Sequence, residues 1–308
     1  MRIVSLLPSS TEIVCLLGLE ENLVGVSHEC DFPPRVSKLP RVVRSDFDPA
    51  ALSQAEIDEK VRAAMKAGRA VCEVDEALLA SLSPDLVLTQ ELCDVCAVPL
   101  ASATAAAEKV ACPPRVLSLH AHALDDVLRD IGRVGEATST SETAARVVAE
   151  LTARLDRVDQ ALAGISRRPR VAALEWLDPL MASGHWVAEM IRRAGGEDFL
   201  GRDREPSVCV PWADFLRYAP ETVLLMPCGF DVERSARDVS LLVSRTGWAA
   251  LPAVAAGQIY AVHGGAYFNR PGPRLVDGVE ILAEILHPEI FPRRRPKEDY
   301  RRLDAVAA

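Results

Sequence analysis

The chain has 308 residues, of which 49% are hydrophobic and 26% charged, a composition typical of a globular protein with one large or two medium cores. Its net charge of -9 excludes nucleic acid and anionic membrane surfaces as main partners, because both select clustered lysine and arginine. No apolar run approaches the roughly 18 residues that a membrane-spanning helix needs.

The N-terminal sequence MRIVSLLPSSTEIV begins with a strand-like run and continues into a helix signal. A secretory signal would place a longer apolar core and a small-residue cleavage site ahead of the first structural element. The eight cysteines lack the spacing of a short disulfide framework, which is typical of a reducing compartment. These features predict a cytoplasmic protein whose cysteines are mostly free thiols.

Short β-type runs alternate with helical patterns along the chain, which favours an α/β architecture with largely parallel sheets. The apolar and β-branched runs predict seven strands, at residues 2–6, 23–27, 85–89, 115–119, 170–174, 222–226 and 258–262. Between the second and third strands, a segment at about residues 50–73 is rich in Ala, Lys and Glu and predicts an additional helix.

Two pairs of segments look like internal copies. LASLSPDLVLT (79–89) and LRYAPETVLLM (216–226) each pass from a helix end through a proline and an acidic residue into a strand. In both, the proline stops the helix and favours an extended conformation for its predecessor. LLPSSTEIVCLLGLEENLVG (6–25) and LMASGHWVAEMIRRAGGEDFLG (180–201) each pass from a serine-bearing loop into a helix closed by glycine. Because the copies occur in the same order, the sequence predicts two similar lobes.

One apolar stripe runs along the segment between the copies and consists of Val148, Leu151, Leu155, Val158, Leu162 and Ile165. These residues step by three and four, as one face of a helix does. Residues 141–163 contain neither proline nor glycine, and at 1.5 Å per residue the helix would span about 35 Å. It is either a core helix of one lobe or a rigid stem that joins two lobes, and the repeats on both sides favour the stem.

Together with the two lobes and the stem, five segments resemble the class III substrate-binding proteins of metal-chelate ABC importers: RIVSLLPSSTEI, GVSHECDFPP, LSPDLVL, GHWVAEMIRRAGGEDF and YFNRPGPRLVDGVEIL. That family serves cobalamin, siderophores and haem, and its cobalamin-binding members are the most similar to this chain. The resemblance covers nearly all of residues 2–288, apart from the insertion at about 50–73. It implies two Rossmann-like lobes with central, largely parallel sheets, joined by a single long backbone helix.

This fold divides the chain into an N-terminal α/β lobe at residues 1–120, a linking helical region with the stem at 121–168, and a C-terminal α/β lobe at 169–292. The helical insertion belongs to the first lobe. Residues 293–308, which include the basic stretch Arg293–Arg295, are predicted to be a solvated tail.

The family binds its ligand in the cleft between the lobes, on loops at the carboxyl ends of strands, as open α/β sheets generally do. The resemblance implies ligand contacts in loops of both lobes: His28, Glu29, Cys30, Arg44, Gln90, Glu91 and Cys93 in the first, and Trp176, Trp212, His263, Tyr267, Asn269 and Arg270 in the second. Aromatic faces would cover an apolar macrocycle, while arginine and amide groups would meet carboxamides or carboxylates at its edge.

The first-lobe loops carry imidazole and thiol groups where the family has aromatic residues: His28, Cys30, Cys93 and Cys96. A single CxxC is a weak zinc signal, because such sites usually show a second ligand pair, which HxC at 28–30 would supply. Three hypotheses stay open. The four side chains bind a soft transition metal, or His28 or Cys93 is an axial ligand to the metal of a bound macrocycle. In the third, the groups form a packed or redox-sensitive pocket wall.

Three other histidines are predicted to have structural positions. His120 and His122 follow the fourth strand and are expected at the start of the next helix. His185 is expected beside a helix cap at Ser183.

The importer-linked members of the family carry a docking glutamate on each lobe. The corresponding residues here are Ala77 and Ala213, so docking to an importer is in doubt. Together with the absence of a recognisable signal, this difference favours an intracellular binding protein.

The leading hypothesis is a cytoplasmic, non-enzymatic protein that holds cobalamin or a related corrinoid between two lobes. Its expected partners are this small molecule and a corrinoid-using or cofactor-assembly enzyme, with no nucleic acid and no membrane. The first alternative is a protein that binds zinc, iron, cobalt, haem or another metal chelate through its histidines and cysteines. The second is a thiol- or acid/base-dependent enzyme using His28, Glu29, Glu91 and Cys93, although no GxSxG, HExxH or phosphate-loop motif is present.

Overall fold

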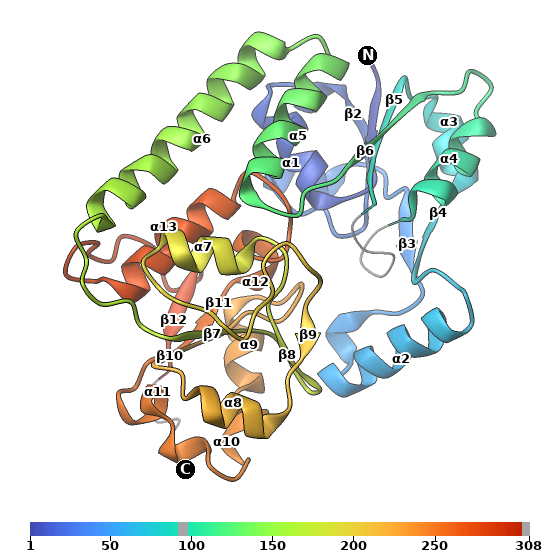
Figure 1. Cartoon of the computed structure of the whole chain (residues 1–308). Coiled ribbons are helices and arrows are strands. Elements are labelled where there is room, and N and C mark those ends of the chain that lie inside the picture. The colour runs from blue at the N-terminus through green and yellow to red at the C-terminus, as the bar shows by residue number, and fades with distance from the viewer. Residues whose placement is uncertain (92–97, 304–308) are drawn as a thin grey trace. The chain divides into compact units, whose positions relative to one another are not determined.

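The computed structural model describes residues 1–91 and 98–303 of the chain (Figure 1). These residues form two compact units. Unit 1 comprises residues 1–121 and 125–149, and unit 2 comprises residues 122–124 and the chain from residue 150 onward. The boundary falls inside the long helix α6 (Ser141–Leu162). Among the described residues, no helix combines the length and the apolar character that crossing a bilayer requires.

Unit 1 is built on a four-stranded sheet in the order β2-β1-β5-β6, in which all neighbouring strands are parallel. Its strands are β1 (Ile3–Ser5), β2 (Leu23–Val26), β5 (Leu86–Gln90) and β6 (Arg115–Leu119), which confirms the four strands predicted in this region. Every residue of β5 is buried, as expected for a central strand of a parallel sheet whose two faces are covered.

The helices of unit 1, apart from its part of α6, are α1 (Pro8–Leu16), α2 (Gln54–Lys66), α3 (Glu76–Leu82), α4 (Leu100–Glu108) and α5 (Leu124–Ala137, whose first residue is counted with unit 2). Proline occupies the first turn of α1, and Asp75 caps α3 by accepting a hydrogen bond from Leu78 N at 3.0 Å. The buried core of this unit is aliphatic and includes Val4, Leu6, Val42, Val43, Leu79, Val87, Val98 and Val110.

The insertion predicted at about residues 50–73 contains helix α2, which confirms the additional helix. Ser53 and Glu56 form a capping box at its start: Ser53 Oγ accepts from Glu56 N, and the Glu56 carboxylate accepts from Ser53 N at 2.8 Å. The sequence did not predict the two strands on either side of the helix, β3 (Val43–Ser45) and β4 (Cys72–Val74), which pair antiparallel.

Helix α6 has 22 residues, in agreement with the helix predicted over 141–163. Its first part belongs to unit 1, where it approaches α5 so closely that a Cβ on Gly135 would lie 2.5 Å from Ala144 Cβ. Its second part belongs to unit 2, and there the predicted stripe is buried at Leu151, Leu155, Val158 and Leu162.

Unit 2 is built on a six-stranded sheet in the order β12-β11-β10-β7-β8-β9. Its strands are β7 (Val171–Leu177), β8 (Leu180–Ala182), β9 (Val208–Cys209), β10 (Thr222–Leu225), β11 (Ile259–Val262) and β12 (Tyr300–Arg302). The central strands β7, β10 and β11 are parallel and match the three predicted strands, whereas β8, β9 and β12 run antiparallel to their neighbours. The predicted α/β architecture is confirmed, with an antiparallel extension at each edge of this sheet.

The helices of unit 2 beyond α6 are α7 (Val187–Arg193), α8 (Trp212–Tyr218), α9 (Val232–Asp238), α10 (Ser240–Val243), α11 (Pro252–Ala255), α12 (Gly264–Tyr267) and α13 (Leu275–Leu286). The chain also contains short 3-10 helices at Glu20–Asn22, Pro34–Lys38, Pro49–Ala51 and Trp248–Ala250. The main hydrophobic cluster of this unit surrounds the fully buried side chains of Phe215 and Trp248 with aliphatic residues.

The predicted copies at 79–89 and 216–226 share one local geometry. Helix α3 ends at Ser83 (φ 43°) and α8 ends at Ala219 (φ 49°), and in each case a proline and a strand follow. Both residues are left-handed, so the extended conformation predicted before each proline is wrong. A left-handed residue closes the helix end, and this local requirement outweighs the preference imposed by the proline.

Residues 293–303 pack onto unit 2, so the prediction of a solvated tail is wrong for this segment. Strand β12 pairs with β11, and the buried Tyr300 donates a hydrogen bond from its hydroxyl to Glu284 of α13 at 3.0 Å. The Arg293 guanidinium lies over the Tyr300 ring, 4.1 Å from its centroid. Aromatic packing and strand pairing therefore hold the segment in place.

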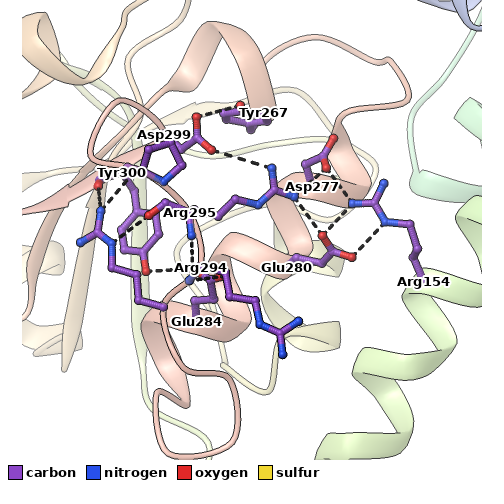
Figure 2. Close-up of polar contacts among 11 residues, drawn as sticks. Arg154, Tyr267, Asp277, Glu280, Glu284, Arg294, Arg295, Asp299 and Tyr300 are labelled. Atoms are coloured by element: carbon purple, nitrogen blue, oxygen red, sulfur yellow. Dashed lines mark hydrogen bonds and ion pairs between the residues drawn. The ribbon is translucent and has the colours of Figure 1, made fainter.

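Arg295 anchors the same segment to α13, as Figure 2 shows. Its guanidinium lies 2.7 Å from the Asp277 carboxylate and 2.9 Å from that of Glu280. Arg154 of α6 binds the same two carboxylates, each at 2.6 Å. The basic residues that suggested a solvated tail are thus matched by acidic residues of another element, and these partners cannot be recognised from local composition.

Candidate functional site

Polar side chains that were predicted to contact a ligand follow the parallel strands of unit 1. His28 comes after β2, Gln90 ends β5, and Glu91 follows it. The Glu91 carboxylate lies 3.6 Å from Nδ1 of His120, which follows β6. Because neighbouring parallel strands end at the same edge of a sheet, these residues share the edge at which open α/β sheets bind ligands.

Gln90 has an unsatisfied hydrogen-bond acceptor at this edge. The residue is 8% exposed, and its Oε1 has no hydrogen-bond partner among the described residues. An unpaired buried polar group costs about 1–3 kcal/mol, and such groups are rare in native proteins. A ligand with an N–H or O–H donor would satisfy this oxygen.

His28 and Cys30, predicted to act together as metal ligands, have different surroundings. His28 is half-buried, and burial lowers the pKa of its imidazole against the opposing effect of Glu29. Cys30 is 1% exposed, and its Sγ lies 3.1 Å from Thr11 Oγ1, which donates to Ser5 Oγ at 2.8 Å. The thiol therefore belongs to a buried hydroxyl network, which gives Cys30 a packing role inside unit 1.

Cys93 and Cys96, the other two predicted metal ligands, lie outside the described residues, so the four-ligand site stays a prediction. Within residues 1–91 and 98–303, no group of three or more His, Cys, Asp or Glu side chains is placed to hold a metal ion. Arg44, a predicted ligand contact, lies on β3, where its largely exposed side chain forms an ion pair with Asp75. It therefore belongs to the small antiparallel sheet and not to the carboxyl edge.

In unit 2, predicted contacts follow the parallel strands in the same way. Trp176 is the next to last residue of β7, and its ring centroid lies 5.5 Å from that of Phe230. His263 follows β11 and caps α12, where its Nδ1 accepts a hydrogen bond from Ala266 N at 3.1 Å. This bond requires an unprotonated Nδ1, so the neutral ring carries its proton on Nε2.

The Tyr267 side chain is held by the C-terminal segment and by two arginines. Its hydroxyl donates to Asp299 Oδ1 at 2.9 Å, as drawn in Figure 2. The guanidinium groups of Arg274 and Arg295 lie 5.6 and 6.0 Å from the ring centroid. Burial raises the pKa of Tyr267 to about 12, and the bond to Asp299 adds to this effect. The phenol is therefore neutral and fixed in orientation.

Asn269 carries a second unsatisfied acceptor. Its Nδ2 donates to Met226 O just after β10 at 3.3 Å, while its buried Oδ1 has no hydrogen-bond partner among the described residues. The amide lies against the start of α12, where a Cβ on Gly264 would come within 2.5 Å of Asn269 Oδ1. A side chain at position 264 would therefore displace the Asn269 amide, so the observed position of this amide requires glycine there.

Trp212 is positioned by packing inside unit 2. Its Nε1 donates to Thr246 O at 2.9 Å, and its ring stacks on Phe215 with centroids 5.0 Å apart. The Arg245 guanidinium covers the ring at 5.2 Å. These neighbours account for the position of the Trp212 side chain, and its contact with a ligand stays a prediction.

Arg270, another predicted ligand contact, directly follows Asn269 in the loop after α12 and is half-buried.

Sequence reasoning missed a pair of neighbouring histidines in unit 2. The ring centroids of His122 and His185 are 5.7 Å apart. The helix cap expected at Ser183 is wrong, because Ser183 Oγ donates to Asp198 and the residue before α7 is Trp186. The HxH pattern at 120–122 is a weak signal, and no local pattern links it to residue 185.

The chain matches the family model described as periplasmic binding protein over residues 3–265. It is 24% identical over 295 residues to the uncharacterized ABC transporter substrate-binding lipoprotein YvrC of Bacillus subtilis, covering 94% of this chain and 81% of that protein. It is 23% identical over 305 residues to a vitamin B12-binding protein of Vibrio cholerae, covering 92% of this chain and 88% of that protein. Its fold is similar to that of the periplasmic heme-binding protein RhuT from Roseiflexus sp. RS-1, with a TM-score of 0.70 and 22% identity over 94% of this chain and 98% of that chain.

These similarities confirm the resemblance found in the sequence and correct two expectations. The predicted cytoplasmic location is wrong, because the matching family is periplasmic and the relatives are a lipoprotein and periplasmic proteins. The doubt about importer docking, which rested on Ala77 and Ala213, has no support, because the relatives include an ABC transporter component. The relatives are binding proteins and not enzymes, as the sequence predicted.

Proposed function

Because the chain belongs to the periplasmic binding protein family, we propose that it is the ligand-binding component of an ABC importer and that its ligand is cobalamin or a related corrinoid. A pair of unsatisfied amide oxygens supports this proposal: Gln90 Oε1 and Asn269 Oδ1, each buried near the carboxyl edge of its sheet. Both are hydrogen-bond acceptors, so a ligand that satisfies them must present donors.

The edge groups of a corrinoid have the required chemistry. The corrin ring carries primary carboxamides, each of which offers two N–H donors. The propionates of haem are acceptors at neutral pH and would leave both oxygens unsatisfied, at about 1–3 kcal/mol for each. Trp176 and Tyr267 add aromatic faces that suit the apolar surface of a macrocycle.

The proposed contacts come from the loops of both units. They are His28, Glu29, Gln90 and Glu91 from unit 1, and Trp176, His263, Tyr267, Asn269 and Arg270 from unit 2. Cys30, Arg44 and Trp212 are left out of this set, because the buried hydroxyl network, the Asp75 carboxylate and the Phe215 ring account for their positions.

Titration of the purified chain with cyanocobalamin, followed by calorimetry and absorbance, tests the ligand. We expect saturable binding of one corrinoid per chain. A dissociation constant weaker than about 0.1 mM corresponds to a standard free energy of only about -5 kcal/mol and would remove the proposal.

Two substitutions test the amide oxygens. Gln90→Leu and Asn269→Leu remove one acceptor each, and each should weaken cyanocobalamin binding by about tenfold to a hundredfold, the equivalent of about 1–3 kcal/mol. Gln160→Leu changes an exposed amide of α6 and is the matched control, which should bind like the unmodified chain. Binding that is unchanged in either variant would show that the amide replaced in it does not contact the ligand.

A second candidate ligand is haem or another chelate whose metal has an exchangeable axial position. His28 favours it, because burial lowers the pKa of the imidazole and so favours the neutral form, which binds haem iron. Adding ferric haem should then shift the Soret band, and His28→Gln should abolish the shift. An equal Soret shift in the unmodified chain and in His28→Gln would show that His28 is not the axial ligand, and a Soret band that the unmodified chain does not shift would leave only the corrinoid.

The membrane component of an importer is the proposed partner. Cells that lack this gene should accumulate less labelled cobalamin from the medium. The unmodified gene should restore uptake, whereas a gene with both Gln90→Leu and Asn269→Leu should not. Equal uptake with and without the gene would remove the importer from the proposal.

A further inference from the structure

Two histidines from distant parts of the sequence lie side by side in unit 2. His122 belongs to the short segment 122–124, and His185 directly precedes Trp186 and α7. Their ring centroids are 5.7 Å apart, and the ring planes are inclined by 57°. Two imidazoles bound to one metal ion at about 2.1 Å have centroids about 4.5–6.5 Å apart, depending on the angle at the metal. The observed separation lies in that range.

The backbone of His185 is strained and firmly held. Its φ of 53° lies in the left-handed region, which costs a residue with a Cβ about 1–2 kcal/mol. His185 N donates to Glu205 O at 2.7 Å, and Arg204 N donates to His185 O at 2.8 Å. Strain of this kind persists where the surroundings over-determine it, and it concentrates at functional sites.

The imidazole of His185 is preorganised and has an unused nitrogen. It stacks on the buried Trp186 ring, with centroids 5.4 Å apart, and Trp186 Nε1 donates to Phe268 O at 2.7 Å. His185 Nδ1 is buried and has no hydrogen-bond partner among the described residues. A histidine with a purely packing role would normally pair this nitrogen, whereas a metal ligand keeps it for an ion.

Helix α7 also places His122. Glu189 of this helix accepts a hydrogen bond from Leu124 N at 3.1 Å, two residues after His122. The same carboxylate lies 3.7 Å from Arg193, one turn further along the helix. Because His185 lies just before α7, this one element positions both imidazoles.

We propose that His122 and His185 together bind a late first-row divalent transition metal ion, of which Ni²⁺ and Cu²⁺ are the favoured members. Imidazole is a preferred ligand of these ions, and affinity rises along the series to copper. Since no third His, Cys, Asp or Glu completes a metal-holding group in the described parts of the chain, the ion keeps positions for water or a small chelator. Such an open site suits an ion that is exchanged and not a structural ion. This inference goes beyond corrinoid binding and does not depend on it.

Calorimetric titration of the tag-free, full-length chain with NiCl₂ tests the pair, after alkylation of the exposed thiols of Cys112, Cys209 and Cys228. The unmodified chain should bind one ion with a dissociation constant below about 0.1 mM. His185→Asn removes the imidazole while keeping a residue that tolerates the left-handed conformation. This variant and His122→Gln should each weaken Ni²⁺ binding by at least about tenfold.

His120→Gln is the matched control, because His120 is a partly exposed histidine two residues from His122 and interacts with Glu91 in unit 1. It should bind Ni²⁺ like the unmodified chain. A second readout is the broadening of histidine ring signals in nuclear magnetic resonance spectra by substoichiometric Cu²⁺, which should affect His122 and His185 first.

Unchanged Ni²⁺ affinity in both His122→Gln and His185→Asn would overturn the proposal, as would the absence of Ni²⁺ binding by the unmodified chain below about 0.1 mM. Since the Ni²⁺ titration contains no corrinoid, a failure of cyanocobalamin binding would leave the metal site standing. Retained cyanocobalamin binding in the two variants would show that they remain folded, so that their loss of Ni²⁺ is specific.

Discussion

The two units share a parallel core and diverge beside its first strand. In unit 1, β1 leads through α1 to the parallel strand β2, with Ile3 opposite Leu23. In unit 2, β7 instead turns back into the antiparallel β8, and the counterpart of β2 is reduced to an isolated parallel bridge between Glu197 and Arg170, which directly precedes β7. A hairpin between the first strand and its helix thus extends the sheet of unit 2 and leaves the parallel pairing of β7, β10 and β11 intact.

The carboxyl edges of the two sheets differ in chemistry as well. The edge in unit 1 carries ionisable and amide groups, among them His28, Gln90 and Glu91. The edge in unit 2 carries the aromatic Trp176 and, in the α12 loop, Asn269. Each unit nevertheless has one buried amide oxygen without a partner among the described residues. The shared feature is an acceptor for hydrogen bonds, and the surroundings of that acceptor are what distinguish the units.

The largest expected effect concerns the two cores. Trp248 is fully buried in unit 2, and Trp248→Ala should lower the free energy of unfolding by about 3–5 kcal/mol, through lost burial and the cavity that remains. Leu79 is equally buried in the aliphatic core of unit 1, and Leu79→Ala should cost about 2–5 kcal/mol. Urea denaturation measures both losses.

Hydrogen exchange assigns these losses to the units. Trp248→Ala should speed exchange in β10 and β11, and Leu79→Ala should speed it in β5. Faster exchange in the opposite unit would contradict the view that each unit has its own core.

The second prediction concerns a carboxyl group of unit 2. Burial raises the pKa of Asp198 to about 6, although Gly201 N, Leu200 N and Ser183 Oγ donate hydrogen bonds to it. Between the pKa of the unfolded chain near 4 and this value, the folded chain binds more protons than the unfolded chain, so stability falls as pH rises. The loss is at most about 3 kcal/mol and is complete just above pH 6.

Asp198→Asn removes this titration. The free energy of unfolding of the variant, relative to that of the unmodified chain, should therefore increase from pH 4 to pH 6.5 and then stay constant. Denaturation curves at several pH values measure the difference. Parallel pH profiles for the two proteins would show that Asp198 has an ordinary pKa.

The third prediction separates the repeated helices α3 and α8. Asp75 caps α3, whereas no side chain of a described residue caps α8 at Pro211. Asp75→Ala should lower the free energy of unfolding by about 1 kcal/mol through loss of the cap, and the ion pair with the largely exposed Arg44 side chain adds little. Asp214→Ala, in the first turn of α8, is the control and should change stability by less than about 0.5 kcal/mol. Equal losses of stability in Asp75→Ala and Asp214→Ala would show that the cap at Asp75 does not distinguish α3 from α8.

The smallest effects are expected at the shared helix ends. Ala219→Gly and Ser83→Gly relieve a left-handed conformation that costs about 1–2 kcal/mol, while glycine adds a conformational cost of about 0.5–1 kcal/mol. Each variant should therefore gain about 0.5 kcal/mol of stability, seen as a small rise in Tm. Ser81→Gly, inside α3, should instead lose up to about 1 kcal/mol. A loss at either helix end would show that the αL residue is not strained there.

Local pattern was sufficient for the parallel strands and failed for the antiparallel ones. Strands such as β5 and β10 consist largely of apolar or β-branched residues, and their type follows from composition and flanking turns. Strands β8, β9 and β12 have only two or three residues, too few for a period to be recognised. They form because they pair with strands at the edges of the unit 2 sheet, and those edges exist only after the sheet has assembled.

The candidate site divides in a similar way. Gln90 and His263 could be placed at strand ends from chain order alone. The packing environments of Cys30 and Trp212 could not be predicted in this way, because they depend on contacts with Thr11 and Phe215. The unsatisfied oxygens were also beyond the sequence, since a missing partner can be recognised only when all neighbours are known.

By itself, the sequence determined the alternation of strands and helices, the repeated segments and the 22-residue helix α6, because these follow from interactions within a few residues of one another. Tertiary structure alone decided that Arg295 joins Asp277 and Glu280, and that His122 comes within reach of His185. Those contacts form between side chains far apart along the chain, and their energies depend on burial and geometry that exist only once the sheets and helices have packed.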